Sequence, residues 1–251
     1  MTDLIYWTAI RDEQTPTLTP SIPFESYLSM EELQQLSSFR FPKRRSEWLL
    51  GRWSIKYLLR HSLFDYKDMP EVQVQVKNEP EGMPFMEAVS SRVRLPLQVS
   101  ISHREHIAFC ALTAARGVIV GADLEWVENR PPSFLEDYFT SAEYAAGLAY
   151  QGGVQDLYFT LLWSLKEAVL KAVGKGLRLD TRRVEISGLE DLPGALQDSA
   201  WRSAAVTFGM DPSLEWRLSW RHLNCFIYSV AAGFPNGAAP PQWVEVPPDL
   251  E

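Results

Sequence analysis

A helix that ends in a glycine stop is the feature that most constrains this chain. The segment 162–177 reads Leu-Trp-Ser-Leu-Lys-Glu-Ala-Val-Leu-Lys-Ala-Val-Gly-Lys-Gly-Leu. Its apolar residues recur at the spacing of one helical face, at Leu162, Leu165, Val169 and Val173. Gly174 and Gly176 follow, and glycine supplies the backbone conformation that commonly ends a helix. The segment therefore predicts the last turns of an amphipathic helix.

Two charged residues lie off that apolar line. Glu167 and Lys171 are four residues apart, so they project the same way, roughly 6 Å apart along the helix axis. One interpretation is a surface ion pair worth a few tenths of a kcal/mol. The alternative is a functional pair, and a second acidic cluster upstream favours it. Asp123 and Glu125 lie in a predicted strand and emerge from the same face, roughly 7 Å apart.

The acidic pair is suited to a metal ion. Two close carboxylates repel each other unless a cation lies between them or one is protonated. A hard ion such as Mg²⁺ takes one or two carboxylates together with waters and substrate phosphates. Taken alone, a D-x-E pair such as Asp123 and Glu125 is more often a strand end that points into water.

Other candidate residues are less specific. Ser102 and His103 follow a predicted strand, where a hydroxyl and an imidazole could both donate to phosphate oxygens. Glu143 is an acid on a predicted helix. The chain has no G-x-S-x-G, H-E-x-x-H, Walker A or G-x-G-x-x-G motif, which argues against a serine hydrolase, a zinc protease and an ordinary nucleotide fold.

Composition narrows the class of protein. The 251 residues suffice for one large domain or two small ones, and no apolar run approaches the roughly 20 residues that span a bilayer. The N-terminus lacks the basic segment of a secretory signal, and two cysteines do not indicate a disulfide-stapled fold, so we expect a cytoplasmic protein. A net charge of -8 argues against nucleic-acid binding. One local basic segment could hold a small polyanion or form a solvated helix face: Lys43, Arg44, Arg45, Arg52, Lys56 and Arg60.

Periodicity predicts an α+β fold in which neighbouring strands are antiparallel. Helices are expected from a capping box at Ser29 and Glu32 to about Phe39, from Pro42 to about Phe64, from a cap pair at Ser133 and Glu136, and after a break at Gly152 and Gly153. Strands are expected at 4–10, 71–77, 97–101, 107–112, 118–125, 182–187, 204–208, 216–220 and 226–232. The segment 78–86 is expected to be a loop, and the tail from Pro235 to be poorly ordered. No internal repeat is recognisable.

In combination the motifs resemble a known family. Ser100-Ile-Ser-His, Val120-Gly-Ala-Asp-Leu-Glu, Phe139-Thr-Ser-Ala-Glu-Tyr and Trp163-Ser-Leu-Lys-Glu-Ala-Val-Leu-Lys, with Gly174-Lys-Gly-Leu, resemble the 4′-phosphopantetheinyl transferases of the long, Sfp-like branch. Leu49-Leu-Gly-Arg resembles the family's N-terminal arginine motif, and the resemblance covers roughly 45–177. The combination of G-x-D-x-E with W-S-x-K-E-A-x-x-K is specific, whereas each motif alone is weak.

The resemblance implies two similar α+β halves related by a pseudo-twofold, with the active site between them. The expected parts are an N-terminal half at 1–115 that binds the phosphates of coenzyme A, a C-terminal half at 116–234 that binds Mg²⁺, and a tail at 235–251. Asp123, Glu125 and Glu167 match the metal-binding carboxylates, and Lys171 matches the lysine near the transferred phosphate. Further residues match phosphate contacts or are candidates for them: Ser102, His103, Arg52, Arg45 and Lys166.

The implied reaction moves phosphopantetheine from coenzyme A to a serine of an acyl or peptidyl carrier protein and releases 3′,5′-ADP. Glu167, or Glu143 as its rival, is the expected base. The chain has Met83 where many relatives have lysine, which affects the expected strength of 3′-phosphate binding and not the chemistry. Arg104 is a second departure, since a small residue is expected there. The alternatives are a Mg²⁺-dependent pyrophosphohydrolase and a non-catalytic carrier-binding module. The implied protein is a monomer.

Overall fold

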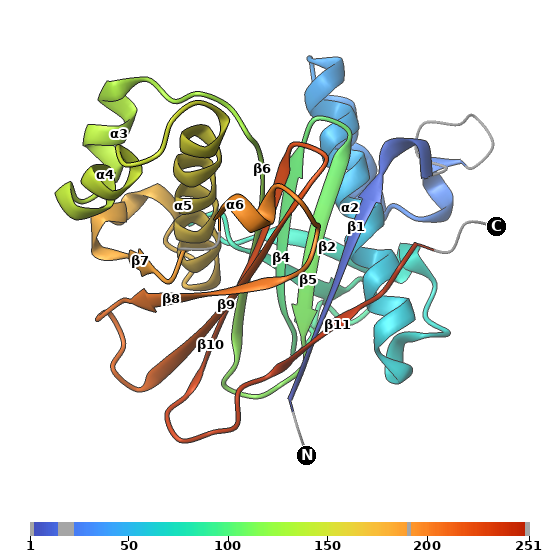
Figure 1. The fold of residues 1–251 in the computed structure, drawn as a ribbon. Helices are drawn as coiled ribbons and strands as arrows, with labels where there is room; N and C mark the ends of the chain where they lie inside the picture. The colour runs from blue at the N-terminus through green and yellow to red at the C-terminus, as the bar shows by residue number, and fades with distance from the viewer. Residues whose placement is uncertain (1–2, 15–22, 190–191, 249–251) are drawn as a thin grey trace. The chain divides into compact units, whose positions relative to one another are not determined.

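The computed structural model describes residues 3–14, 23–189 and 192–248. The chain forms two compact units, which are coloured by residue number in Figure 1. Unit 1 comprises residues 1–116 and 242–251, and unit 2 comprises 117–241. Each unit combines a mainly antiparallel sheet with helices, which confirms the predicted α+β class.

Unit 1 has a four-stranded sheet in the order β11-β1-β5-β4 and a separate two-stranded hairpin, β2-β3. The bounds of these strands are β1 Leu4–Arg11, β2 Val74–Asn78, β3 Pro84–Ala88, β4 Gln98–Arg104, β5 Ile107–Thr113 and β11 Gln242–Glu245. Helix α1 (Met30–Ser38) lies by β2, and the long helix α2 (Pro42–Ser62) packs along β5, β1 and β4 (Figure 1). The core of unit 1 therefore lies between α2 and the sheet.

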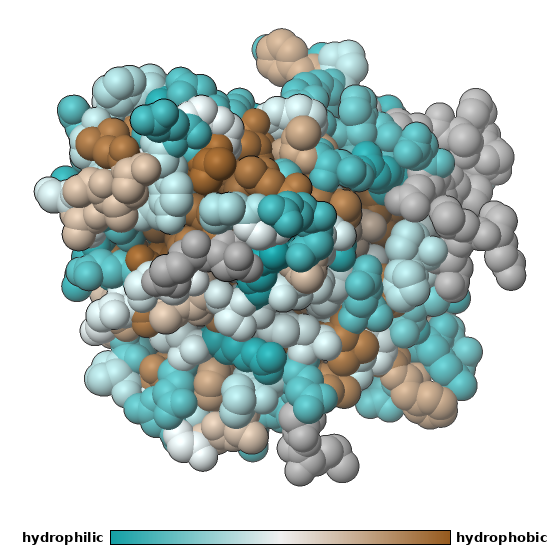
Figure 2. Space-filling model, viewed as in Figure 1, coloured by the Kyte–Doolittle hydropathy of each residue, from teal (hydrophilic) through white to brown (hydrophobic). Residues whose placement is uncertain are grey.

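Unit 2 has a five-stranded antiparallel sheet in the order β6-β10-β9-β8-β7. Its strands are β6 Ile119–Trp126, β7 Glu185–Ser187, β8 Arg202–Thr207, β9 Leu214–Leu223 and β10 Phe226–Pro235. Its helices are α3 Pro132–Tyr138, α4 Ser141–Gly147, α5 Gly153–Ala172 and α6 Leu192–Ala195. The long helix α5 packs against β6 and β10. On the face drawn in Figure 2, hydrophobic side chains of this unit gather around α5 and α6.

The two units repeat one order of elements. Unit 1 runs β1, α1, α2, β2, β3, β4, β5, and unit 2 runs β6, α4, α5, β7, β8, β9, β10 once α3 and the short α6 are set aside. The strand order also matches, because β1-β5-β4 in unit 1 corresponds to β6-β10-β9 in unit 2. The sequence shows no recognisable repeat because packing constrains only the apolar character of most positions.

Several boundaries differ from the prediction. The segment at Glu71–Gln73 is a 3₁₀ turn, and β3 begins at Pro84, inside the predicted loop. Helix α3 begins with Pro131 as its N-cap and has no side-chain cap, so the predicted cap of Ser133 and Glu136 is wrong. The break before α5 is confirmed, since Gly152 has a φ of 55°. Further 3₁₀ turns lie at Asp12–Gln14, Phe24–Ser26, Phe64–Tyr66, Gly176–Arg178 and Thr181–Arg183.

The segment predicted to be a loose tail contains strand β11, and its last residues, 249–251, lie outside the described residues. Strand β11 pairs in parallel with β1, and Leu4 lies opposite Gln242. Tyr57 on α2 donates its hydroxyl to the carbonyl of Pro247 at 2.9 Å. The proline and alanine content of this segment suggested an unpaired tail. Strand pairing satisfies backbone N–H and C=O groups irrespective of such composition, so the prediction was wrong. Within the described residues, no helix is long and apolar enough to cross a membrane.

Candidate functional site

The acidic motif and the charged helix meet in unit 2. Strand β6 presents Gly121, Asp123 and Glu125 on one face, and α5 packs against this strand. Two residues of a strand advance about 7 Å and four residues of a helix about 6 Å. Asp123 contacts Lys171 and Glu125 contacts Trp163, so β6 and α5 run in opposite directions, with Glu167 on the helix between the two contacts.

Gly121 sets how closely α5 can approach β6. A Cβ atom at this position would lie 1.8 Å from the carbonyl oxygen of Ala168 and 2.6 Å from the nitrogen of Ala172. Both distances are far below van der Waals contact, so only glycine allows this packing. The glycine of the G-x-D-x-E motif thus brings the backbone of the helix against the strand that carries the carboxylates.

Asp123 and Lys171 form the tightest contact in the cluster. The Lys171 ammonium donates to Oδ1 of Asp123 at 2.6 Å. The Asp123 side chain is 4% exposed and that of Lys171 is 28% exposed. Burial alone would lower the pKa of Lys171, but the charge of Asp123 and the hydrogen bond to it outweigh burial and raise that pKa. The ammonium therefore neutralises a buried carboxylate.

Glu167 is an acid in an unfavourable place for its charge. Burial, then the negative charges of Asp123 and Glu125, raise the pKa of Glu167 to about 7, although the ammonium of Lys171 opposes this. Its Oε1 atom is buried and has no hydrogen-bond partner in the described structure. A cation that binds the unpartnered Oε1 atom would therefore stabilise the charged form of Glu167.

Glu125 is held through both carboxylate oxygens. The indole N–H of Trp163 donates to Oε1 at 3.1 Å, and a guanidinium N–H of Arg130 donates to Oε2 at 3.1 Å. The side chains of Glu125 and Arg130 are 15% and 13% exposed. Arg130 follows β6 in the loop to α3, and its role is not visible in either sequence motif.

The donor set suits a divalent cation, although the carboxylates are not drawn together around one. Across the described ranges, no three Asp, Glu, His or Cys side chains are placed so that they could hold a metal ion as they stand. Lys171 and Arg130 occupy oxygens of Asp123 and Glu125 instead. Hard carboxylate oxygens are nevertheless the ligands that Mg²⁺ prefers, and the unpartnered oxygen of Glu167 is such a ligand.

The structure does not bring Lys166 and Glu143 to this cluster. The Lys166 ammonium is fully buried and donates to Glu143 at 2.8 Å and to the carbonyls of Thr181 and Val184 at 3.0 and 2.6 Å. The other acceptor sites of Glu143 take the backbone N–H groups of Thr140 and Ile186. All three ammonium protons and both carboxylate oxygens are thus used inside unit 2.

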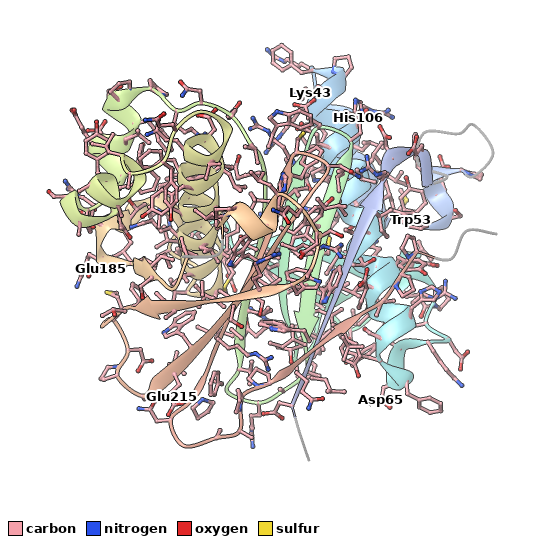
Figure 3. The ribbon with its side chains drawn as sticks, in the orientation of Figure 1. Lys43, Trp53, Asp65, His106, Glu185 and Glu215 are labelled. Atoms are coloured by element: carbon pink, nitrogen blue, oxygen red, sulfur yellow. The ribbon has the colours of Figure 1, made fainter. Side chains whose placement is uncertain are left out.

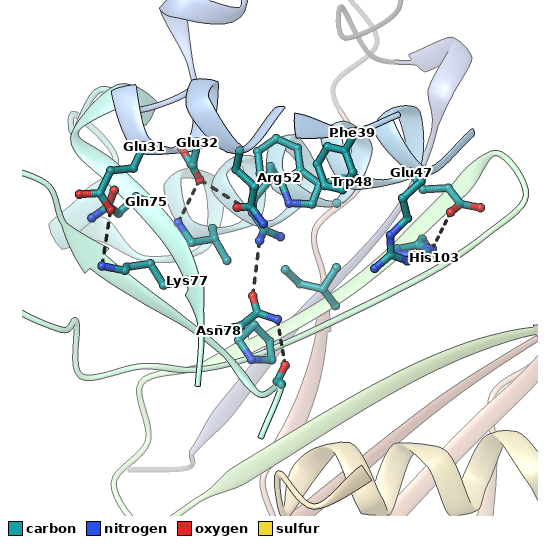
Figure 4. Close-up of a pocket in the computed structure, with 17 residues that line it drawn as sticks. Glu31, Glu32, Phe39, Glu47, Trp48, Arg52, Gln75, Lys77, Asn78 and His103 are labelled. Atoms are coloured by element: carbon teal, nitrogen blue, oxygen red, sulfur yellow. Dashed lines mark hydrogen bonds and ion pairs between the residues drawn. The ribbon is translucent and has the colours of Figure 1, made fainter. Parts of the chain in front are cut away.

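Unit 1 contains a polar cavity of about 580 Å³ next to the predicted phosphate residues. Figure 4 shows Arg52, Lys77 and His103 around it, and Arg44 also lines it. Arg52 is 7% exposed, lies over the ring of Trp48 at 4.7 Å and donates to Asn78 at 3.4 Å. Burial lowers the pKa of Arg52 to about 10, which leaves its guanidinium charged at neutral pH. Three carboxylates line the same cavity, and Lys77 lies 3.5 Å from one of them, that of Glu31. An anionic ligand in this cavity would therefore meet cations that already have acidic neighbours.

Ser102 and His103 lie on opposite faces of β4, because neighbouring residues of a strand alternate. His103 lines the cavity and has Nδ1 at 3.8 Å from Glu47, whereas Ser102 is buried. Arg45 does not line the cavity and lies 5.1 Å over the ring of Phe24. Of the predicted phosphate residues in unit 1, the structure brings Arg52 and His103 together at the cavity.

The sequence analysis missed other residues at the cavity. Lys77 lines the cavity. Its place at the end of the alternating segment 71–77, just before the loop that contains Gly82, is the sequence signal that could have identified it as a cavity residue. Lys56 was expected on a basic helix face but is 1% exposed and pairs with Glu32 at 2.5 Å. Lys43 does lie on the surface, and Figure 3 shows it near His106, with which it lines a separate cavity of about 340 Å³.

The chain is similar to proteins of known family. The family model of the 4′-phosphopantetheinyl transferase superfamily matches residues 119–230, which include β6 and α5. A holo-(acyl-carrier-protein) synthase from Bacillus anthracis, solved in complex with CoA, matches 46% of this chain and 94% of its own, with 18% identity and a TM-score of 0.38.

Curated relatives extend over more of the chain. The 4′-phosphopantetheinyl transferase HetI of Nostoc sp. is 31% identical over 179 residues, 69% of this chain and 71% of its own. The transferase psf-1 of Bacillus pumilus is 27% identical over 207 residues, 81% of this chain and 80% of its own. The transferase Sfp of Bacillus subtilis is 24% identical over 201 residues, 79% of this chain and 84% of its own. The chain belongs to the 4′-phosphopantetheinyl transferase superfamily.

Proposed function

We propose that this protein transfers the 4′-phosphopantetheinyl group of coenzyme A to a serine hydroxyl of an apo acyl or peptidyl carrier protein, and that it requires Mg²⁺. Membership of the family supports the reaction class. The observation that carries the proposal is the packing of α5 against β6, which pairs Lys171 with Asp123 and places Glu167 where the charges of Asp123 and Glu125 raise its pKa. Carboxylates that lie close enough to repel one another destabilise the folded protein unless a cation or a proton compensates their charge.

The reaction is a displacement at phosphorus. The serine oxygen forms a bond to the phosphorus that carries the pantetheine arm, the bond from that phosphorus to the bridging oxygen breaks, and 3′,5′-ADP leaves. Mg²⁺, held by Asp123, Glu125 and Glu167, would stabilise the negative charge that develops on the pyrophosphate oxygens. Lys171 supplies a fixed positive charge beside Asp123, and its raised pKa keeps it protonated at neutral pH.

The serine proton needs an acceptor, and Glu167 is the better candidate. Its Oε1 atom has no hydrogen-bond partner in the described structure, so one carboxylate oxygen of Glu167 is available to take the proton while the other would hold the cation. Glu143 is fully engaged by Lys166 and by backbone N–H groups. We therefore propose a structural role for Glu143 and Lys166 and a catalytic role for Glu167.

The cavity of unit 1 is proposed to take the phosphorylated adenosine end of coenzyme A. Arg44, Arg52, Lys77 and His103 supply cations or hydrogen-bond donors there. Gly82 and Pro84 also line the cavity, so the loop that contains Met83 lies beside it. Arg44 and Lys77 are positioned to replace the charge that lysine provides in many relatives. Ser102 and Arg45 remain predicted phosphate contacts.

Partners and location follow from this proposal. The acceptor is a folded carrier domain. One chain contains both the acidic residues of unit 2 and the cavity residues of unit 1, so we propose that the enzyme acts as a monomer. No disulfide joins Cys110 and Cys225 in the described structure, which is compatible with the reducing cytoplasm. That both units contribute to one active site stays a prediction.

Intact-mass spectrometry of an apo carrier protein tests the proposal. After incubation with the protein, coenzyme A and Mg²⁺, the carrier should gain one phosphopantetheinyl group, and EDTA or Asp123→Ala should abolish the gain. Cleavage of coenzyme A without a mass gain would instead indicate a pyrophosphohydrolase. Carrier binding without either product, across several carrier types, would indicate a non-catalytic binding module.

A further inference from the structure

Trp163 holds Glu125 through a hydrogen bond from its indole N–H. The indole N–H of Trp163 is 3.1 Å from Oε1 of Glu125, a normal hydrogen-bond length. Trp163 is 8% exposed, and its neighbours on α5, Leu162 and Ser164, are fully buried. Glu125 lies near the end of β6, where its side chain is 15% exposed.

An aromatic clamp fixes the orientation of the indole. Phe134 and Tyr138 of α3 both meet the Trp163 ring edge to face, with centroids 4.8 and 5.0 Å away and interplanar angles of 67° and 71°. Such edge-to-face pairs contribute roughly 0.5–1.5 kcal/mol beyond the area they bury. The clamp therefore holds the indole N–H in one direction, toward Glu125.

The two donors to Glu125 differ in their effect on its charge. The indole N–H is neutral, so it orients the carboxylate without neutralising its negative charge. The guanidinium of Arg130 is charged and occupies Oε2. A cation that binds Glu125 must compete with Arg130, but it need not displace Trp163.

We propose that Trp163 is a positioning residue for the divalent-cation site, which acts by orienting Glu125 through its indole N–H. This inference rests on the proposed function, which makes Glu125 a metal ligand. It also assigns a task to α3, whose aromatic side chains hold the indole. Donors that orient a metal ligand typically change metal affinity by about 10–100-fold when they are removed.

The direct test is Mn²⁺ binding to the full chain without substrates, followed by the electron paramagnetic resonance signal of free Mn²⁺. The wild type should bind Mn²⁺, and Trp163→Phe should raise the Kd about tenfold or more. Trp220→Phe is the matched control, since Trp220 is 1% exposed in the same unit and its indole nitrogen finds no acceptor in the described part of the chain. This control should bind Mn²⁺ within about twofold of the wild type.

Turnover separates positioning from packing. In Trp163→Phe the half-saturating concentration of Mg²⁺ should rise about tenfold, while the KM for coenzyme A and the kcat at saturating Mg²⁺ stay within about threefold. A loss of kcat that Mg²⁺ does not restore would overturn the inference. Should Trp163→Phe fail to fold, site-specific replacement of Trp163 by benzothienylalanine removes the N–H but keeps the ring shape, and the same changes are expected.

The outcomes distinguish the inference from the proposed function. Wild-type binding of Mn²⁺ with equal affinity in Trp163→Phe would overturn the positioning role and leave the metal site intact. Failure of the wild type itself to bind Mn²⁺ would overturn the metal site and the inference together.

Discussion

Lys166 and Glu143 form a buried ion pair at 2.8 Å in unit 2, and Lys56 and Glu32 form its counterpart in unit 1. In both units the glutamate closes a capping box, with Ser29 as the N-cap in one and Thr140 in the other. In both, the second carboxylate oxygen accepts a backbone N–H from the segment that follows the long helix, from Val76 or Ile186. The pair thus ties three elements together at the same place in each repeat.

The first prediction concerns this pair. Lys166→Met should lower the free energy of unfolding of unit 2 by about 3–5 kcal/mol, because it leaves Glu143 buried without a counter-ion. Lys175→Met is the matched control, since Lys175 is exposed beyond α5, and should change stability by less than about 0.5 kcal/mol. Urea unfolding followed by circular dichroism measures both. Equal stability of Lys166→Met and the wild type would contradict the structural role.

Particular residues show what the sequence could predict. The α5 helix, its glycine break and the paired carboxylates of β6 follow from local spacing, so they were found. Most strands were placed as well, but β3 and β11 lie in segments that were predicted to be a loop and a tail. Burial of Lys56 and Lys166 could not be found in this way, because their partners are 24 and 23 residues distant and depend on tertiary packing. Arg130 and the role of Trp163 depend on the meeting of α3, α5 and β6.

Gly121 carries the second prediction. Gly121→Ala should destabilise unit 2 by at least about 1–3 kcal/mol and lower transferase activity, because the added methyl would meet the carbonyl of Ala168 at 1.8 Å and force α5 away from β6. Gly153→Ala is the control, since a Cβ there would meet nothing within 4 Å. Thermal unfolding and initial rates of carrier modification measure the two effects. A fully active, fully stable Gly121→Ala would show that β6 and α5 do not need this approach.

The third prediction separates the two candidate bases. Glu167→Gln should lower kcat by about 10²–10⁴-fold while the protein stays folded, because it removes the proton acceptor. Glu143→Gln should chiefly lower the melting temperature, because its carboxylate serves Lys166 and two backbone N–H groups. Rates are measured by intact mass of the carrier and stability by circular dichroism. Near-normal turnover of Glu167→Gln would remove Glu167 from the role of base.

The fourth prediction is a pH dependence of stability in the metal-free protein. Burial raises the pKa of folded Glu167 to about 7 from an ordinary value near 4.5, so the folded state holds a proton that the unfolded state has lost. Stability from this group is therefore complete below pH 4.5 and is lost as the pH rises through about 7. Urea unfolding in EDTA between pH 4.5 and 8 should show this decline, and Glu167→Gln should reduce it. The same decline in both proteins would assign it to other groups.

The last prediction concerns the cationic cavity of unit 1. Arg44 is exposed and lines this cavity, whereas its neighbour Lys43 lines a different one and pairs with Glu105 at 3.4 Å. Arg44→Gln should raise the KM for coenzyme A about fivefold, equivalent to roughly 1 kcal/mol for an exposed charge contact, with little change in kcat. Lys43→Gln, which removes the same charge one residue away, should leave the KM within about twofold. The difference between the two variants should shrink at high ionic strength, because salt screens exposed charges. Equal KM values for both variants would show that the effect is one of net charge rather than of a phosphate site in this cavity.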